Sequence, residues 1–283
     1  MFAFVNRYNT IIYWRRLALV LLPVPFFFAC QDVIQVNLNN AAPRMIIEGS
    51  LSNEPDTVKV ILSKSTDYFN PQTIPMVTGA TVSITDNSGN VYHPDTAIDG
   101  YYFFKNLIGS PGKTYTLKVD VNGSEYTGLS TMPGVVPIDS LQIQGSSDGD
   151  KENVLYIYIH DPAGIHNYYR VKVYRNGKLM SPTDNTSPIM LFSDKYFDGR
   201  YTPLRVTSRR VGVDYFLPGD TLRVQLFSID VTTYNFLRQL RDLTNSGGAF
   251  STSTPDNPDN NLSNGAMGYF AAWAVSEGTL VVK

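Results

Sequence analysis

From Met45 onward the chain alternates apolar and polar residues with a period of two. This is the spacing at which successive side chains of a β-strand face opposite sides of a sheet. Residues 58–62 and 81–85 show it clearly, and turn-forming clusters separate such segments. Asn-Gly pairs stand at 122–123 and 176–177, where they predict two-residue hairpin turns because both positions of such a turn require positive φ. The pattern predicts a mostly β protein.

The remaining expected strands share this alternation or a short apolar run bounded by turn residues. They are residues 45–51, 91–93, 100–104, 115–119, 125–127, 138–143, 154–159, 167–174, 221–227, 269–275 and 279–282. Pro133 and Pro137 interrupt the series, so we place a domain boundary between residues 134 and 135. Residues 45–134 are expected to form an Ig-like or transthyretin-like β-sandwich, and residues 135–283 a second antiparallel β-rich domain.

One helix is predicted near residues 231–246, in the second domain. Asp230 can cap it by accepting a hydrogen bond from an otherwise unpaired backbone N–H. Phe236, Leu240 and Leu243 follow at i, i+4 and i+7, which places them on one apolar face. Two glycines at 247–248 end the pattern.

The N-terminus has the order of a bacterial lipoprotein signal. Arg15 and Arg16 precede an apolar run over residues 17–28, and Ala29 stands before Cys30, the single cysteine of the chain. The run is shorter than the roughly 20 residues of a membrane-spanning helix. An ordinary secretory signal with an incidental cysteine ranks lower, because the single cysteine occupies the lipid-attachment position. We therefore expect residues 1–29 to be a lipoprotein signal peptide, Cys30 to carry the lipid, and residues 30–44 to form a tether.

The residues after the anchor and the overall charge limit where the protein works. Gln31 follows Cys30, whereas Asp at this position retains lipoproteins in the inner membrane, so we expect the outer membrane, at its periplasmic face or at the cell surface. Lys and Arg number 23 against 25 Asp and Glu. Three of the arginines belong to the signal, so the mature chain is acidic and lacks the basic patch of a nucleic-acid-binding protein.

The sequence shows no arrangement typical of catalysis. His93, His160 and His166 each stand at a predicted strand end or turn, without the spacing of a metal site. A lipidated Cys30 provides no thiol for a nucleophile, and no Gly-x-Ser-x-Gly elbow occurs. We therefore expect no catalytic residues, no cofactor, no metal and no enzymatic activity.

Two polar loops are candidate sites. Asp148, Asp150 and Glu152 alternate as in a calcium loop, but the glycine and the closing glutamate do not stand where an EF-hand needs them, so a solvated hairpin loop is favoured. Residues 251–265 form a long polar loop between the helix and the closing strands. Long loops are often functional, so this loop is a candidate contact surface; equally, it can cover a sheet edge while its asparagines satisfy backbone groups.

Two resemblances follow from these residues. Val-Thr-Gly-Ala-Thr-Val-Ser-Ile-Thr-Asp at 77–86, Gly-Tyr-Tyr-Phe at 100–103 and Tyr-Thr-Leu-Lys-Val at 115–119 lie within residues 45–132. This region resembles the carboxypeptidase-regulatory-like and transthyretin-like β-sandwiches.

The whole mature chain resembles the Bacteroidetes outer-membrane lipoprotein family called domain-of-unknown-function family 4249. The matching stretches are Cys-Gln-Asp-Val-Ile at 30–34, Asp-Pro-Ala-Gly at 161–164, Asn-Tyr-Tyr-Arg at 167–170, Phe-Asp-Gly at 197–199, Thr-Tyr-Asn-Phe at 233–236 and Asn-Leu-Ser-Asn-Gly-Ala-Met-Gly-Tyr-Phe at 261–270. Asp259-Asn260 departs from a more usual proline and serine. The family provides no catalytic residues to carry over.

Members of this family resemble lipoproteins encoded beside TonB-dependent receptors. The resemblance therefore implies a non-enzymatic accessory or ligand-capture partner of a TonB-dependent outer-membrane transporter. The alternative is an independent surface lipoprotein that binds a glycan or peptide through exposed aromatic residues. The chain has 18 Tyr and 15 Phe, but strands favour aromatic residues for packing alone, so their number does not decide between these functions.

Overall fold

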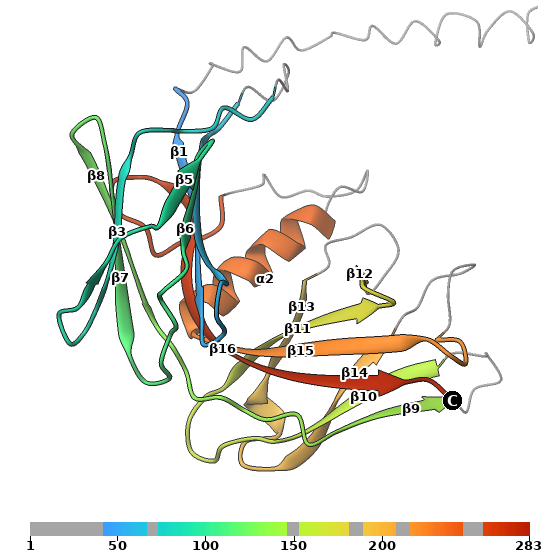
Figure 1. Cartoon of the computed structure of the whole chain (residues 1–283). Helices are drawn as coiled ribbons and strands as arrows, with labels where there is room; N and C mark the ends of the chain where they lie inside the picture. Colours follow the sequence, from blue (N-terminus) through green and yellow to red (C-terminus); the bar gives the residue numbers. More distant parts are fainter. Residues whose placement is uncertain (1–41, 67–72, 146–152, 181–188, 208–215, 246–256) are drawn as a thin grey trace, which may run out of the picture. The chain divides into compact units, whose positions relative to one another are not determined.

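The computed structural model describes residues 42–66, 73–145, 153–180, 189–207, 216–245 and 257–283 (Figure 1). Residues 42–283 form one compact unit. Its elements in chain order are β1 (Met45–Ser52), β2 (Val58–Lys64), β3 (Thr81–Asp86), β4 (Val91–Tyr92), β5 (Thr96–Ile98), β6 (Tyr101–Phe104), β7 (Thr114–Val121), β8 (Ser124–Thr131), β9 (Ser140–Gly145), β10 (Asn153–His160), β11 (Tyr168–Arg175), β12 (Lys178–Leu179), β13 (Met190–Ser193), the 3₁₀ helix η2 (Asp194–Tyr196), β14 (Tyr201–Thr207), β15 (Thr221–Ile229), α2 (Val231–Asn245) and β16 (Met267–Val281). The protein is mostly β with a single α-helix in the part described, as the alternation predicts.

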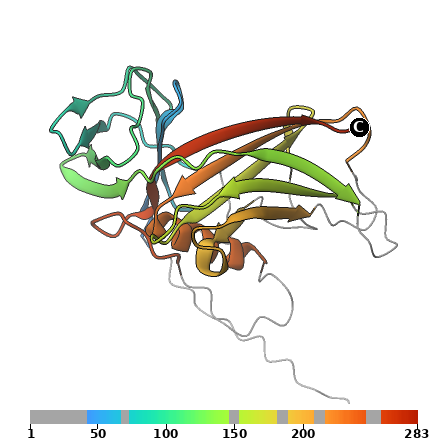
Figure 2. The same cartoon turned by 90° about the horizontal axis from the view of Figure 1, so that it is seen from below.

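Three sheets contain these strands. The largest has the order β12-β11-β15-β16-β1-β2-β6-β5, with β13 also paired to β11. The other two are β14-β10-β9 and β4-β3-β7-β8. Figure 2 shows the long red strand β16 of the largest sheet extending from one smaller sheet to the other.

Strand β16 joins the two predicted domains. Its first half pairs with β1, from Ile46 opposite Met267 to Ser52 opposite Trp273, and its second half pairs with β15. The predicted boundary at 134/135 lies between β8 and β9, so the regions on its two sides share this strand. The pairing of β1 with β16 is parallel, whereas the sequence predicted antiparallel sheets throughout. A tight hairpin connects two strands that run antiparallel. Strands β1 and β16 are far apart in the chain and are not joined by a hairpin, so they can pair in parallel.

The end of the chain also differs from the prediction. Residues 269–275 and 279–282 were expected as two strands, but β16 is continuous over Met267–Val281. After Val275, exposed and partly buried residues alternate along β16, as expected for a strand with one side in solvent. The polar residues 276–278, which the prediction took as a break between two strands, therefore belong to one continuous strand. Glu277 on this side pairs with Arg223 of β15 at 3.1 Å.

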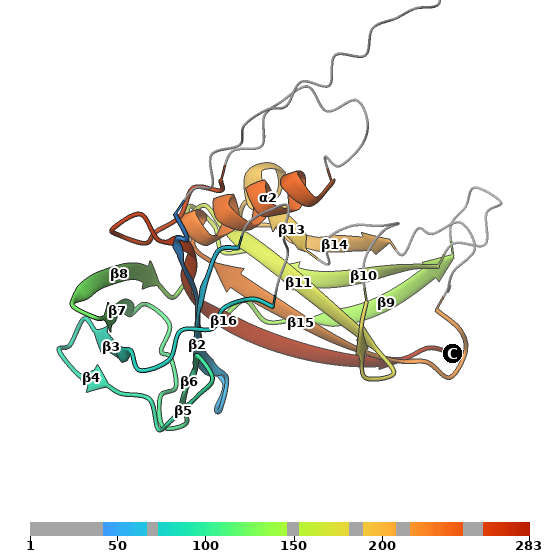
Figure 3. The same cartoon turned by 90° about the horizontal axis from the view of Figure 1, so that it is seen from above.

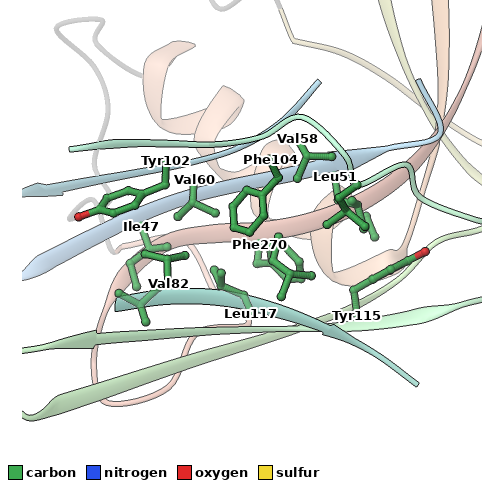
Figure 4. Close-up of a cluster of buried hydrophobic side chains, with 14 of the residues drawn as sticks. Ile47, Leu51, Val58, Val60, Val82, Tyr102, Phe104, Tyr115, Leu117 and Phe270 are labelled. Carbon is green, nitrogen blue, oxygen red and sulfur yellow. The ribbon is translucent and has the colours of Figure 1, made fainter. Parts of the chain in front are cut away.

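Each half of the unit has its own core. In the first core, β1, β2, β6 and the start of β16 pack against β3 and β7 (Figure 4). Ile47 and Phe270 from one sheet meet Leu117 from the other, and all three are fully buried. A second core fills the space between β11, β15 and β16 on one side and β10 and β14 on the other.

Helix α2 lies where the sequence predicts a helix, near residues 231–246, and Asp230 caps it as expected. The Thr233 N–H donates to the Asp230 carboxylate at 2.7 Å, which satisfies one of the unpaired donors at a helix N-terminus. Phe236 and Leu237 are buried with Phe227 and Trp273 on the face of the largest sheet, and Figure 3 shows α2 lying across that face. None of the described helices is long and apolar enough to cross a membrane.

Both Asn-Gly turns have the predicted backbone. Asn122 and Gly123 have φ of 52° and 82° between β7 and β8, and Asn176 and Gly177 have φ of 50° and 82° between β11 and β12. These values fit the turn type that matches the twist of a two-residue hairpin. The turns therefore set the register of both hairpins.

Candidate functional site

Several sites considered from the sequence lie outside the described residues. These include Cys30, nearly all of the tether at 30–44, and the acidic loop with Asp148, Asp150 and Glu152. Of the polar loop at 251–265, residues 257–265 are described.

The described part of this polar loop covers a sheet edge. The Asn261 amide donates to the carbonyl oxygens of Leu129 and Phe270, and the Ser263 N–H donates to the carbonyl of Thr127 in β8. Leu262 forms a β-bridge with Gly128. This is the second of the two interpretations of the loop, in which its asparagines satisfy backbone groups. The contact role of the loop stays a prediction, and residues 251–256 lie outside the described residues.

Strand β10 presents one apolar and one aromatic face. Leu155, Ile157 and Ile159 are fully buried in the second core. Because side chains alternate along a strand, Tyr156, Tyr158 and His160 lie on the opposite face.

Neighbouring strands extend this second face. Gln142 of β9 and Arg205 of β14 stand opposite Tyr156, and Tyr201 of β14 stands opposite His160. We call Gln142, Tyr156, Tyr158, His160, Tyr201 and Arg205 the aromatic face.

The rings of the aromatic face contact one another. Tyr158 and Tyr201 stack with centroids 5.6 Å apart and an interplanar angle of 23°. The His160 ring lies 4.6 Å from that of Tyr201, and its Nδ1 is 2.8 Å from an Asp139 carboxylate oxygen. Tyr201 is 52% exposed and the His160 side chain 72% exposed. This part of the sheet therefore exposes the rings of Tyr201 and His160 beside the partly buried Tyr156 and Tyr158, with the amide of Gln142 and the guanidinium of Arg205 around them.

A second group of side chains gathers just beyond this face. Asp161 follows His160 at the end of β10, Asp194 begins η2, and Asp198 lies in the turn before β14. One carboxylate oxygen from each of the three lies within 4.8 Å of the others. Asp161 and Asp194 are buried and Asp198 is exposed.

Backbone and side-chain donors hold each of these carboxylates. Asp161 accepts hydrogen bonds from the Tyr169 hydroxyl at 2.5 Å and from the Gly199 N–H at 3.0 Å. Asp198 accepts from the Gly164 N–H at 2.9 Å, and Asp194 from the Asn167 N–H at 2.7 Å. Burial raises the pKa of Asp161, the hydrogen bonds from Tyr169 and Gly199 oppose this, and the negative charges of Asp194 and Asp198 add to it.

Burial raises the pKa of Tyr169 far above its usual value, and its hydrogen bond to Asp161 adds to this. The Tyr169 hydroxyl therefore stays a proton donor to the Asp161 carboxylate.

The model of the family described as domain of unknown function (DUF4249) matches residues 31–279. The chain belongs to this family. No curated protein matches the sequence. Among solved structures, the two fibronectin type-III domain segment from chicken tenascin aligns with 66% of this chain and 90% of its own length, at 14% identity and a TM-score of 0.21.

Three stretches through which the sequence resembles DUF4249 meet at the carboxylate group. Residues 161–164, 167–170 and 197–199 contribute Asp161, Asp198 and four groups that donate hydrogen bonds to the three carboxylates. Sequence reasoning did not single out this group as a site, because its members lie up to 37 positions apart and only the fold brings them together. The signal present in the sequence was the pair of acidic residues that precede glycine turns at 164 and 199.

Proposed function

We propose that this DUF4249 protein is a lipid-anchored, non-enzymatic binding protein that captures a glycan on the aromatic face. The observation that carries the proposal is the stack of the partly buried Tyr158 on Tyr201, which is 52% exposed, with hydrogen-bonding side chains around it. Burying an exposed ring against the apolar C–H face of a sugar removes apolar surface from water. Gln142, Arg205 and His160 then lie where they can bind sugar hydroxyls, as the few polar groups of a ligand site do.

Glycan binding accounts for the exposure of Tyr201 better than packing within the protein does. An aromatic residue that serves only to stabilise a strand is expected to bury its ring against a neighbour. Tyr169 on the adjacent strand β11 does this, since it is fully buried. Tyr201 instead stacks on Tyr158 while about half of its surface stays in water, so a ligand bound on this face can bury it further.

Glycan binding is tested by affinity electrophoresis against a panel of soluble polysaccharides, followed by calorimetry on any that retard the protein. Tyr158→Ala and Tyr201→Ala each remove one ring of the stack. Each is expected to weaken binding about tenfold, which corresponds to about 1.4 kcal/mol. Tyr196→Ala is the matched control, because Tyr196 is 80% exposed and lies outside the aromatic face. Equal binding by the wild type and both face variants would refute the assignment.

The anchor and the partner rest on the sequence and on the family. Cys30 is proposed as the site of lipid attachment, in the outer membrane, and a TonB-dependent transporter as the protein that receives the captured glycan. Incorporation of labelled fatty acid is expected in the wild type and absent in Cys30→Ala.

Co-purification of tagged protein from native outer membranes tests the transporter separately. If no TonB-dependent transporter is enriched, the protein acts as an independent glycan-binding lipoprotein, and the aromatic face is unaffected by that result.

A further inference from the structure

The carboxylate group of Asp161, Asp194 and Asp198 leaves one buried oxygen without a hydrogen bond. The Asp194 side chain is 1% exposed, and its Oδ1 accepts no hydrogen bond. The exposed imidazole of His166 has its Nδ1 3.7 Å from this oxygen, beyond hydrogen-bond length. A buried carboxylate oxygen in this state needs a partner, because burial has removed the water that would otherwise solvate it.

The charges around this oxygen make the need stronger. Asp161 and Asp198 bring two more carboxylates within 4.8 Å, and like charges at this separation repel. Among the described residues, no Lys or Arg forms an ion pair with any of the three. The neighbouring backbone N–H groups donate to individual oxygens but carry no full positive charge.

We propose that Asp161, Asp194 and Asp198 bind a calcium ion. Ca²⁺ is bound by oxygen ligands at about 2.3–2.6 Å, so two of its ligands can lie as far apart as about 4.6–5.2 Å, a span that accommodates three carboxylate oxygens within 4.8 Å of one another. Ca²⁺ also tolerates irregular carboxylate geometry, whereas Mg²⁺ demands near-ideal octahedral geometry and usually keeps several waters with only one or two carboxylates. Among the described residues, this group consists of carboxylates alone, and the lack of nitrogen or sulfur ligands disfavours zinc.

The hydrogen bonds at the site orient its ligands. The Gly164 N–H holds Oδ1 of Asp198 and the Asn167 N–H holds Oδ2 of Asp194, which leaves the other oxygen of each carboxylate for the ion. Asp161 is held by Tyr169 and by the Gly199 N–H. Water molecules complete the six to eight ligands that Ca²⁺ takes.

Such an ion would stabilise one end of the aromatic face. It links the end of β10, the start of η2 and the turn before β14, and this turn leads directly into Tyr201. The inference does not depend on glycan binding, since the site is built from residues outside the aromatic face.

The test uses purified full-length protein in detergent, stripped of metal with EDTA and titrated with CaCl₂ while thermal unfolding is recorded. A ligand that binds only the folded state raises the melting temperature as its concentration increases. The wild type is expected to show this rise. Asp198→Asn is expected to weaken the apparent Ca²⁺ affinity at least about tenfold, because it removes the charge of a ligand while an oxygen can still accept the Gly164 N–H.

Asp120→Asn is the matched control, because Asp120 likewise accepts the N–H of a glycine, Gly123, at 3.2 Å. Its response to Ca²⁺ is expected to equal that of the wild type. Asp194→Asn is a second variant at the site, and terbium luminescence sensitised by the nearby Tyr169 provides a readout that does not depend on melting. No rise in the wild type overturns the proposal, and so does an equal rise in Asp198→Asn.

Discussion

Gly268, at the start of β16, is the position where a single methyl group is expected to disturb the fold most. Its φ is 102°, a backbone conformation that residues other than glycine rarely adopt. A Cβ at this position would lie 2.1 Å from the carbonyl oxygen of Ile47, its partner in β1. The obstacle is backbone, so it cannot move aside as the end of a flexible side chain can.

The size of the effect follows from the geometry. Ordinary contact with a Cβ begins at 3.4 Å, so β1 and β16 must separate locally by about 1 Å or more. That displacement exceeds the tolerance of backbone hydrogen bonds and would break two or three of them, at about 1 kcal/mol each. The unfavourable φ adds about 1–2 kcal/mol. We expect Gly268→Ala to lower the free energy of unfolding by about 3–5 kcal/mol.

Gly265 provides the matched control for this substitution. It also has positive φ, 68°, but the atom nearest to a Cβ added at this position would be the Arg44 Nη2, at 3.8 Å. Gly265→Ala therefore carries only the cost of the backbone conformation, about 1 kcal/mol. Both free energies are measured by urea unfolding of the purified variants. If the two variants differ by less than about 0.5 kcal/mol, the contact between Gly268 and Ile47 does not limit the pairing of β1 with β16.

Three further substitutions test other parts of the structure. Gly123→Val places a β-branched residue at φ 82° in a hairpin turn, so the melting temperature should fall by the equivalent of about 1 kcal/mol or more; no change would argue against the turn type. Burial lowers the pKa of Lys172 to about 8, and the positive charges of Arg170 and Lys59 add to this effect. Between pH 8 and about 10.5, Lys172 is therefore protonated in the unfolded chain and deprotonated in the folded chain. The free energy of unfolding of the wild type should therefore rise with pH across this window, and that of Lys172→Met should rise less. At pH 7 the variant should be about 1–2 kcal/mol more stable than the wild type, after allowance for solvent screening. An identical pH dependence of the two proteins would contradict the lowered pKa of Lys172. Asn261→Ala removes three hydrogen bonds between the polar loop and the backbone around it. It is expected to lower the free energy of unfolding, measured in urea, by about 1–3 kcal/mol. An unchanged free energy would mean that the loop does not protect the edge of β8.

The site illustrates what a sequence pattern leaves open. Alternation along residues 154–159 places Tyr156 and Tyr158 on one face of a strand, but Tyr201, on which Tyr158 stacks, stands on a strand that begins more than forty residues later. The segment from Ser181 to Thr207 carries no clear period, so β14 was not predicted. The aromatic residues were therefore recognised as a class, while the particular face they form was not.

The carboxylate group was hidden for a related reason. Motif reasoning looks for ligands at short fixed spacings, as in an EF-hand loop. Asp161, Asp194 and Asp198 instead come from the end of one strand and from the turns that precede another, and they meet because β10 pairs with β14. The expectation that the protein has no metal site followed from the short-range motifs alone.

The sequence by itself determined the features whose physical causes lie within a few residues. Alternating side chains specify strands, the Asn-Gly pairs specify hairpin turns through positive φ, and Asp230 with the apolar stripe after it specifies the helix. The tertiary structure decided which distant strands pair, and above all that β16 lies parallel to β1 and antiparallel to β15. Backbone hydrogen bonds are the same for any pair of strands, so the choice between partners depends on which arrangement buries all the apolar faces together.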